Sequence, residues 1–205
     1  MSKQAVSRRA ALKTLGTSAG AITLLPWLSD EGVLAFAALQ KAKAAPAPKV
    51  LSAPQFATLE AIVDAIIPTD ERSPGAKEAR VADYIDLLLT EADAPTKARW
   101  LEGLAAIDAE ATTRFTAPVA KLDDAQMETL LNAISANEKA PQTPLERFFV
   151  MTKQATIHGY YTSEIGIHQE LRYQGNKFQR EFVGCQTEDG KDCPVCGQKH
   201  IGSRG

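Results

Sequence analysis

Apolar residues spaced three and four positions apart are the feature of this sequence that most limits its fold. From Phe56 to Ile67 they mark one face of a helix, which Pro68 ends. Similar stripes run through Trp100 and Leu130, and no strand-like alternation bounded by turn residues stands out. We therefore predict an all-α protein, a compact array of about five or six helices with an irregular C-terminal tail.

Three capping boxes mark where helices begin. In each box a Ser, Thr or Asp is followed three residues later by a Gln or Glu that can reach back to the cap. The pairs are Ser52 with Gln55, Asp123 with Gln126, and Thr143 with Glu146. Pro144 follows Thr143 and suits the first helical position, so this is the clearest predicted helix start in the chain.

The segment "VADYIDLLL" has the pattern of an amphipathic helix. Val81, Tyr84 and Leu88 fall on one face of it, together with Ile85. Asp83 and Asp86 are predicted to point away from that face.

Length and charge limit the class of protein. The chain has 205 residues, is 44% hydrophobic and carries a formal charge of −2, which suits one folded domain. Positive charge does not accumulate beyond the first residues, so no surface for phosphate backbones is expected. Nucleic acid is therefore not a predicted partner.

The N-terminal segment has the order of a secretory signal. Arg8 and Arg9 precede an uncharged stretch from Thr14 to Ser29, which is shorter than the roughly 20 apolar residues of a membrane span. "SRRAALK" resembles the twin-arginine export motif. The resemblance implies recognition by the twin-arginine translocase, export of a folded protein, and a periplasmic location. A chance arginine pair in an ordinary secretory signal is the alternative.

Two A-x-A motifs offer cleavage sites for this signal. They are Ala35-Phe36-Ala37 and Ala42-Lys43-Ala44. With cleavage at the first, the predicted organisation is a signal peptide over 1–37, an Ala-, Lys- and Pro-rich linker over 38–51, a helical domain over 52–184 and a cysteine-containing tail over 185–205.

The helical body shows no recognisable catalytic motif. Glycine-rich phosphate loops, H-E-x-x-H and G-x-S-x-G are absent from the sequence. Glu60 and Asp64 share a helix face and could form an acid/base pair, but two carboxylates there are more typical of a solvated face. His158 and His168 could each act as a ligand or base, yet no third matching group accompanies them. We predict no catalytic residue and no cofactor bound by this chain.

The cysteines gather in the tail. Cys185, Cys193, Cys196 and His200 have residue types that tetrahedral zinc accepts. Export would place the thiols in an oxidising compartment, where disulfides are the default, so we favour a disulfide over zinc. A Cys193–Cys196 bridge would leave Cys185 free to pair with another chain, and a bridge from Cys185 to either remains open. A redox-active C-x-x-C is a further alternative.

Two stretches resemble the gluconate 2-dehydrogenase subunit 3 family. They are "FATLEAIVDAIIPTDERSPGAKEARVADYIDLLL" and "GYYTSEIGIHQELRYQGNKFQREFVGC", within which "AIIPTD" and "GYYTSEIG" are the most specific parts. The similarity extends from Ser52 to Cys185 and includes the twin-arginine leader. The tail motif "CPVCGQKH" departs from the family pattern.

This resemblance implies an accessory subunit rather than an enzyme. Such small subunits assist the assembly and export of a large subunit of the glucose-methanol-choline oxidoreductase class, which carries FAD and lacks its own signal. A cytochrome c subunit often takes the electrons onward. The folded-export signal would then serve both chains. The alternative is an independent periplasmic metal-binding or scaffolding protein that uses the cysteine and histidine cluster.

The stretch "HGYYTSEIGIHQELRYQGN" is the candidate partner interface. Tyr160, Tyr161 and Tyr173 combine broad apolar faces with a polar tip, which is why tyrosine is enriched where proteins meet. Gly159 and Gly166 allow sharp changes of chain direction. The alternative is that these tyrosines complete the protein's own core.

Overall fold

The computed structural model describes residues 29–42 and 47–175, and the regular secondary structure in this part of the chain is helical, without strands. Its helices are α2 (Asp30–Lys41), α3 (Ala53–Ile66), α4 (Val81–Glu91), α5 (Ala94–Phe115), α6 (Asp124–Ser135) and α7 (Pro144–Tyr161), with a 3₁₀ turn η1 (Val119–Lys121) and a π-helical turn η2 (Gly166–Glu170). The predicted all-α class is confirmed.

The predicted capping boxes begin α3, α6 and α7. The Asp123 carboxylate accepts a hydrogen bond from the Gln126 N–H at 2.8 Å, and the Thr143 hydroxyl accepts one from the Glu146 N–H at 3.2 Å. At the start of α3 the Ser52 N–H donates to Gln55 Oε1 at 3.0 Å. These bonds satisfy backbone donors that the first turn leaves without helical partners.

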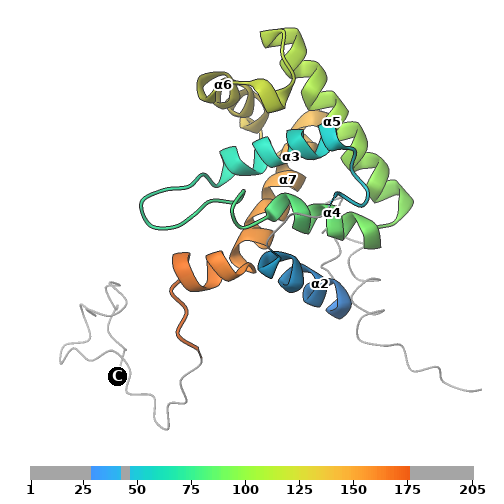
Figure 1. The fold of residues 1–205 in the computed structure, drawn as a ribbon. Coiled ribbons are helices and arrows are strands. Elements are labelled where there is room, and N and C mark those ends of the chain that lie inside the picture. The colour runs from blue at the N-terminus through green and yellow to red at the C-terminus, as the bar shows by residue number, and fades with distance from the viewer. Residues whose placement is uncertain (1–28, 43–46, 176–205) are drawn as a thin grey trace, which may run out of the picture. The chain divides into compact units, whose positions relative to one another are not determined.

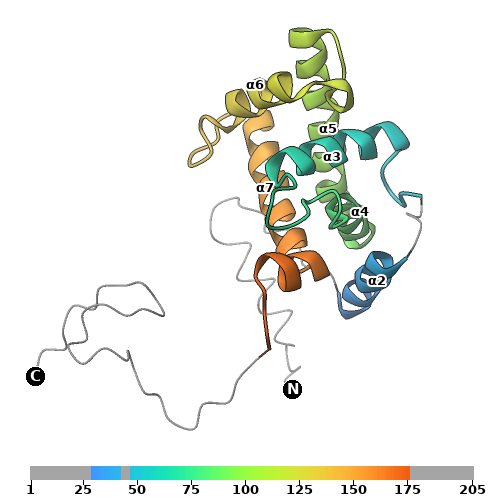
Figure 2. The same ribbon diagram turned by 60° about the vertical axis from the view of Figure 1, so that its left-hand side comes forward.

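Helices α3 and α7 organise the core. α7 starts beside α6, passes α3 and α5, and ends beside α4, while α3 crosses it and also contacts η1 (Figures 1 and 2). The largest fully buried side chains come from these helices and their neighbours: Trp100, Tyr160, Leu59, Ile62, Ile85, Leu89, Leu104, Ile107, Leu130, Val63, Val81 and Val119. Burial of this apolar surface is the main force that holds the array together.

Helix α4 is buried on most of its surface, more than its amphipathic pattern predicts. It packs against α2, α3 and α7, and Leu87 and Leu89 are buried along with the predicted face. Gly159 lies inside α7, where a Cβ atom would be 2.7 Å from Cδ1 of Tyr84. This glycine therefore permits close contact between two helices and does not turn the chain.

Asp86 does not point to solvent, so that prediction is wrong. Its carboxylate is buried and accepts three backbone hydrogen bonds from the segment before α3. The donors are the N–H groups of Lys49 at 2.6 Å, Val50 at 3.0 Å and Leu51 at 2.9 Å. A buried carboxylate needs such partners, and here it fixes residues that belong to the predicted linker.

Helix α2 spans the predicted boundary between the signal peptide (1–37) and the linker (38–51). Ser29 caps it, Asp30 and Glu31 lie in its first turn, and Lys41 lies in its last. Each charge complements the helix dipole at its own end, so the local signals for a helix were present in the sequence.

The stability of the folded protein should depend on the ionised Glu146 side chain at the start of α7. The Glu146 carboxylate accepts hydrogen bonds from the Asn137 side chain and from the N–H groups of Gln142 and Thr143, and these bonds lower its pKa. The Glu146 pKa is therefore lower in the folded state than in the unfolded state. The stabilisation from these bonds is complete at a pH above the unfolded-state pKa, and it is lost as the pH falls through the folded-state pKa.

We therefore expect the Glu146→Gln variant to be less stable at neutral pH and to lose less stability than the wild type on acidification below pH ~4.5. Urea unfolding at a series of pH values measures this difference. Glu128→Gln, at an exposed position of α6, is the matched control. Equal acid dependence in wild type and Glu146→Gln would contradict the assignment.

Candidate functional site

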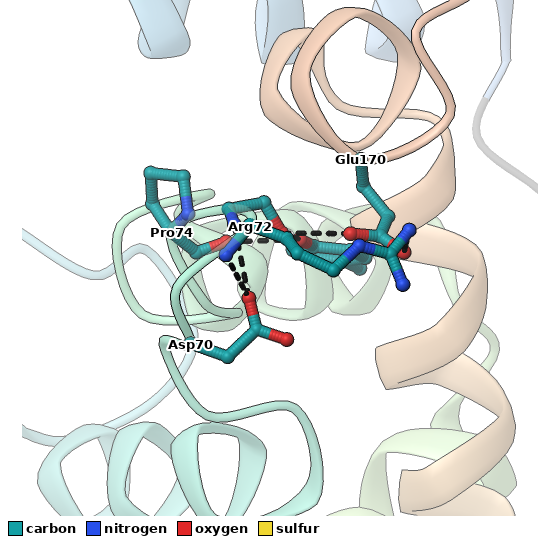
Figure 3. A network of polar contacts seen from close by, with 6 residues as sticks. Asp70, Arg72, Pro74 and Glu170 are labelled. Carbon is teal, nitrogen blue, oxygen red and sulfur yellow. Dashed lines mark hydrogen bonds and ion pairs between the residues drawn. The ribbon is translucent and has the colours of Figure 1, made fainter.

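A polar network joins the loop after α3 to the end of α7. The Tyr160 hydroxyl donates to the Pro74 carbonyl at 2.9 Å and lies 2.9 Å from Ser73 Oγ. Ser73 Oγ in turn donates to Glu170 Oε2 at 2.9 Å, and Glu170 pairs with Arg72 at 3.3 Å. Figure 3 shows Glu170 extending from η2 toward this loop. The network therefore connects the loop after α3 with the end of α7 and with η2, which follow it by 87 and 97 positions in the sequence.

The loop itself is held by local bonds. Asp70 Oδ1 accepts from the N–H groups of Arg72 at 2.8 Å and Ser73 at 3.0 Å (Figure 3). These two backbone bonds lower the Asp70 pKa, since they favour the charged form. Gly75 follows where a Cβ atom would lie 2.6 Å from the Ile67 carbonyl oxygen. At Gly75 the backbone comes back close to Ile67. This tight loop places Ser73 and Pro74 next to Tyr160.

The turn after α7 is equally tight. Ser163 Oγ donates to the Tyr160 carbonyl at 2.6 Å and accepts from the Gly166 N–H at 3.0 Å. A Cβ atom on Gly166 would lie 2.1 Å from the same carbonyl oxygen. Gly166 is therefore needed for η2 to pack here, and η2 carries Glu170 into the network.

The three candidate interface tyrosines have different environments. Tyr160 is 2% exposed and belongs to the core and the network, whereas Tyr161 is 40% exposed and Tyr173 is 50% exposed. Tyr160 packs edge-on against Tyr161, with ring centroids 5.2 Å apart. Tyr160 is thus part of the protein's own core, which was the alternative prediction for these tyrosines. Tyr161 and Tyr173 are accessible enough to contact a partner.

Other exposed apolar side chains lie close to these tyrosines in sequence. Ile157 precedes Tyr161 by one helical turn, and Leu171 follows η2 directly. Among the described residues, the remaining exposed large hydrophobics are Val33 and Leu34 of α2. Exposed apolar residues that gather in one region, rather than scattering singly, mark sites of interaction.

A small pocket lies where α2 meets α4 and α7. Its volume is about 180 Å³, and it is lined by Val33, Phe36, Ala37, Gln40, Tyr84, His158 and Thr162. Burial lowers the His158 pKa and raises that of Tyr84, whose ring lies 5.7 Å from the His158 ring. The pocket is smaller than the ~300 Å³ typical of cofactor or drug-sized ligand sites.

The Tyr84 hydroxyl is buried without a hydrogen-bond partner in the described part of the chain. Burying an unpaired hydroxyl costs about 1–3 kcal/mol, so Tyr84→Phe should leave the free energy of unfolding unchanged or raise it by about 1 kcal/mol. Urea unfolding measures the change. Tyr160→Phe is the matched control, because it removes a bonded hydroxyl and should lose about 1 kcal/mol. An equal loss in both variants would contradict this account.

Glu60 and Asp64 share helix α3, as predicted, and both side chains are partly exposed. Glu60 pairs with Lys77 at 3.3 Å, and burial, followed by the neighbouring Glu78 charge, raises the Asp64 pKa. His158 is half-buried and His168 is exposed. The described residues contain no group of three or more His, Cys, Asp or Glu side chains placed to hold a metal ion.

Several predicted sites fall on residues that the structure does not describe. Arg8 and Arg9 are among them, as are Cys185, Cys193, Cys196 and His200. Within residues 29–42 and 47–175, no helix has the length and apolar character to cross a bilayer.

The comparison with known families decides the assignment. The family model described as gluconate 2-dehydrogenase subunit 3 matches residues 53–179. The chain belongs to this family. No curated protein and no solved structure matches the sequence.

Membership of the gluconate 2-dehydrogenase subunit 3 family indicates a subunit of a dehydrogenase complex. The matched range contains the whole network, from Asp70 to Glu170, whereas α2 precedes it. The two stretches that carried the resemblance are thus the ones that Ser73, Tyr160 and Glu170 join. No sequence pattern points to Ser73 or Glu170, although they follow "AIIPTD" and "GYYTSEIG" by three and four residues.

Proposed function

We propose that this chain is the non-catalytic small subunit of an exported FAD-dependent sugar or alcohol dehydrogenase. It binds a large subunit of the glucose-methanol-choline class and assists its assembly and its export by the twin-arginine route. The complex works in the periplasm, with FAD in the large subunit and electrons passing to a cytochrome c subunit. The observation that carries the proposal is membership of the subunit 3 family.

The partner surface in this proposal is the end of α7 together with the residues around η2. Tyr161 and Tyr173 are exposed in this stretch of the chain, as are Ile157 and Leu171. Large apolar and aromatic side chains contribute most of the binding energy at protein interfaces when a partner excludes water from them. The network holds the end of α7 at Tyr160 and η2 at Glu170. The exposed residues of these segments are therefore carried by a fixed backbone, and less conformational freedom is lost on binding.

Co-expression tests the proposal. A tagged chain should retain the FAD-containing large subunit through purification, whereas the chain alone should show neither flavin absorbance nor dehydrogenase activity. Replacing Arg8 and Arg9 by lysine should keep both proteins in the cytoplasm. A large subunit exported without this chain, or flavin in the isolated chain, would contradict the proposal.

The interface has its own prediction. Tyr161→Ser combined with Leu171→Ser should weaken retention of the large subunit about tenfold or more, which corresponds to about 1.4 kcal/mol. The free energy of unfolding of the isolated chain should fall by only about 1 kcal/mol, because Leu171 is exposed and Tyr161 loses its edge-on contact with Tyr160. Ala133→Ser, at an exposed position of α6, is the control. If the double variant and the control retain the large subunit equally, the binding surface lies elsewhere.

A further inference from the structure

Helix α2 is packed into the folded body through Phe36. This side chain is 4% exposed, and its ring lies 5.0 Å from that of Tyr84 on α4. The opposite face of α2 carries Leu34, which is 72% exposed. The buried face of α2 therefore covers Tyr84 of α4, and removing the helix would expose that side chain to solvent.

Both ends of α2 are tied to other helices. At its start, the Ser29 N–H and hydroxyl donate to the two carboxylate oxygens of Glu91 at 2.8 Å and 2.5 Å. At its end, the Arg80 guanidinium donates to the Leu39 carbonyl. The Glu164 N–H donates to Gln40 Oε1 at 3.3 Å. The helix is therefore held on both sides of Ala37.

This arrangement bears on the first cleavage motif of the leader. Ala35, Phe36 and Ala37 all lie within α2. Proteolytic cleavage concentrates in exposed, weakly ordered segments, and a buried helical segment must open before it can be cut. Opening α2 here would break the contact between Phe36 and Tyr84 and the ties at both ends.

We propose that the mature protein keeps α2, because folding closes the Ala35-Phe36-Ala37 motif to processing. The inference rests on the proposed twin-arginine route in one respect: a chain that folds before transport meets the peptidase with α2 already docked. α2 is then a structural part of the subunit, and the mature chain begins at or before Ser29.

N-terminal sequencing and intact mass of the protein, carrying a C-terminal tag and recovered after export, test this proposal. We expect a mature chain that starts at or before Ser29, including an uncleaved chain. A start at Ala38, or at any other position after Ser29, would overturn the proposal. Arg8→Lys with Arg9→Lys tests the export route separately, because loss of export in that variant supports the route whatever the N-terminus of the wild type.

Limited digestion with elastase, which cuts after alanine, tests the physical cause. Phe36→Ser keeps both alanines of the motif but removes the buried ring, so cleavage within α2 should become about tenfold faster than in the wild type. Leu34→Ser changes the exposed face and should leave the rate unchanged. Equal rates in wild type and Phe36→Ser would show that packing does not protect the motif, and would overturn the proposal.

Discussion

Replacing Asp86 with alanine is expected to lower the free energy of unfolding by about 3 kcal/mol. The buried Asp86 carboxylate accepts hydrogen bonds from the N–H groups of Lys49, Val50 and Leu51. Each buried donor left without an acceptor costs about 1–3 kcal/mol, and water can reach those that are only partly buried. We therefore expect less than the full sum of three such costs.

Thermal and urea unfolding of the isolated chain measure this loss. For a domain of this size, about 3 kcal/mol should appear as a melting temperature lower by about 10 °C. Glu102→Ala, which removes an exposed carboxylate from α5, is the control and should change little. If Asp86→Ala is no less stable than this control, the segment before α3 does not depend on Asp86.

Asp86 also shows where sequence reasoning succeeds and where it fails. The starts of α3, α6 and α7 depend on residues three apart, so the capping boxes predicted them correctly. Asp86 bonds to a segment about 35 residues earlier, and no local pattern encodes that contact. A carboxylate on a helix usually faces water, and burial with backbone partners overrides that tendency.

The same limit applies to the candidate site. The exposed residues of the site, Tyr161 and Tyr173, lie in the tyrosine-rich stretch that the sequence predicts as a partner interface. Its support depends on Ser73 and Glu170, which are separated by 97 positions and meet only in the folded chain. α2 differs, because its cap and its charged end turns are local signals for a helix. The same residues also fit the pattern of a leader followed by a linker, and that pattern gave the wrong prediction for their structure.

Gly166→Ala is expected to lower the free energy of unfolding by about 2 kcal/mol. The added Cβ would lie 2.1 Å from the Tyr160 carbonyl oxygen, which belongs to the backbone and cannot rotate away. Alanine favours helical structure over glycine by up to about 1 kcal/mol, which is less than the cost of overpacking. The turn η2 must therefore shift.

A shift of η2 should spread to both parts of the site. Glu170 would move away from Ser73, and the N–H groups of Leu171 and Tyr173 would lose their bonds to the carbonyls of Gly166 and Ile167. Hydrogen exchange of those two amides should become faster, and retention of the large subunit should fall about tenfold. Ala133→Ser, at an exposed position of α6 far from this turn in the sequence, is the control. Faster exchange with unchanged retention would show that the partner binds without the residues around η2, whereas unchanged exchange would show that the turn tolerates the added atom.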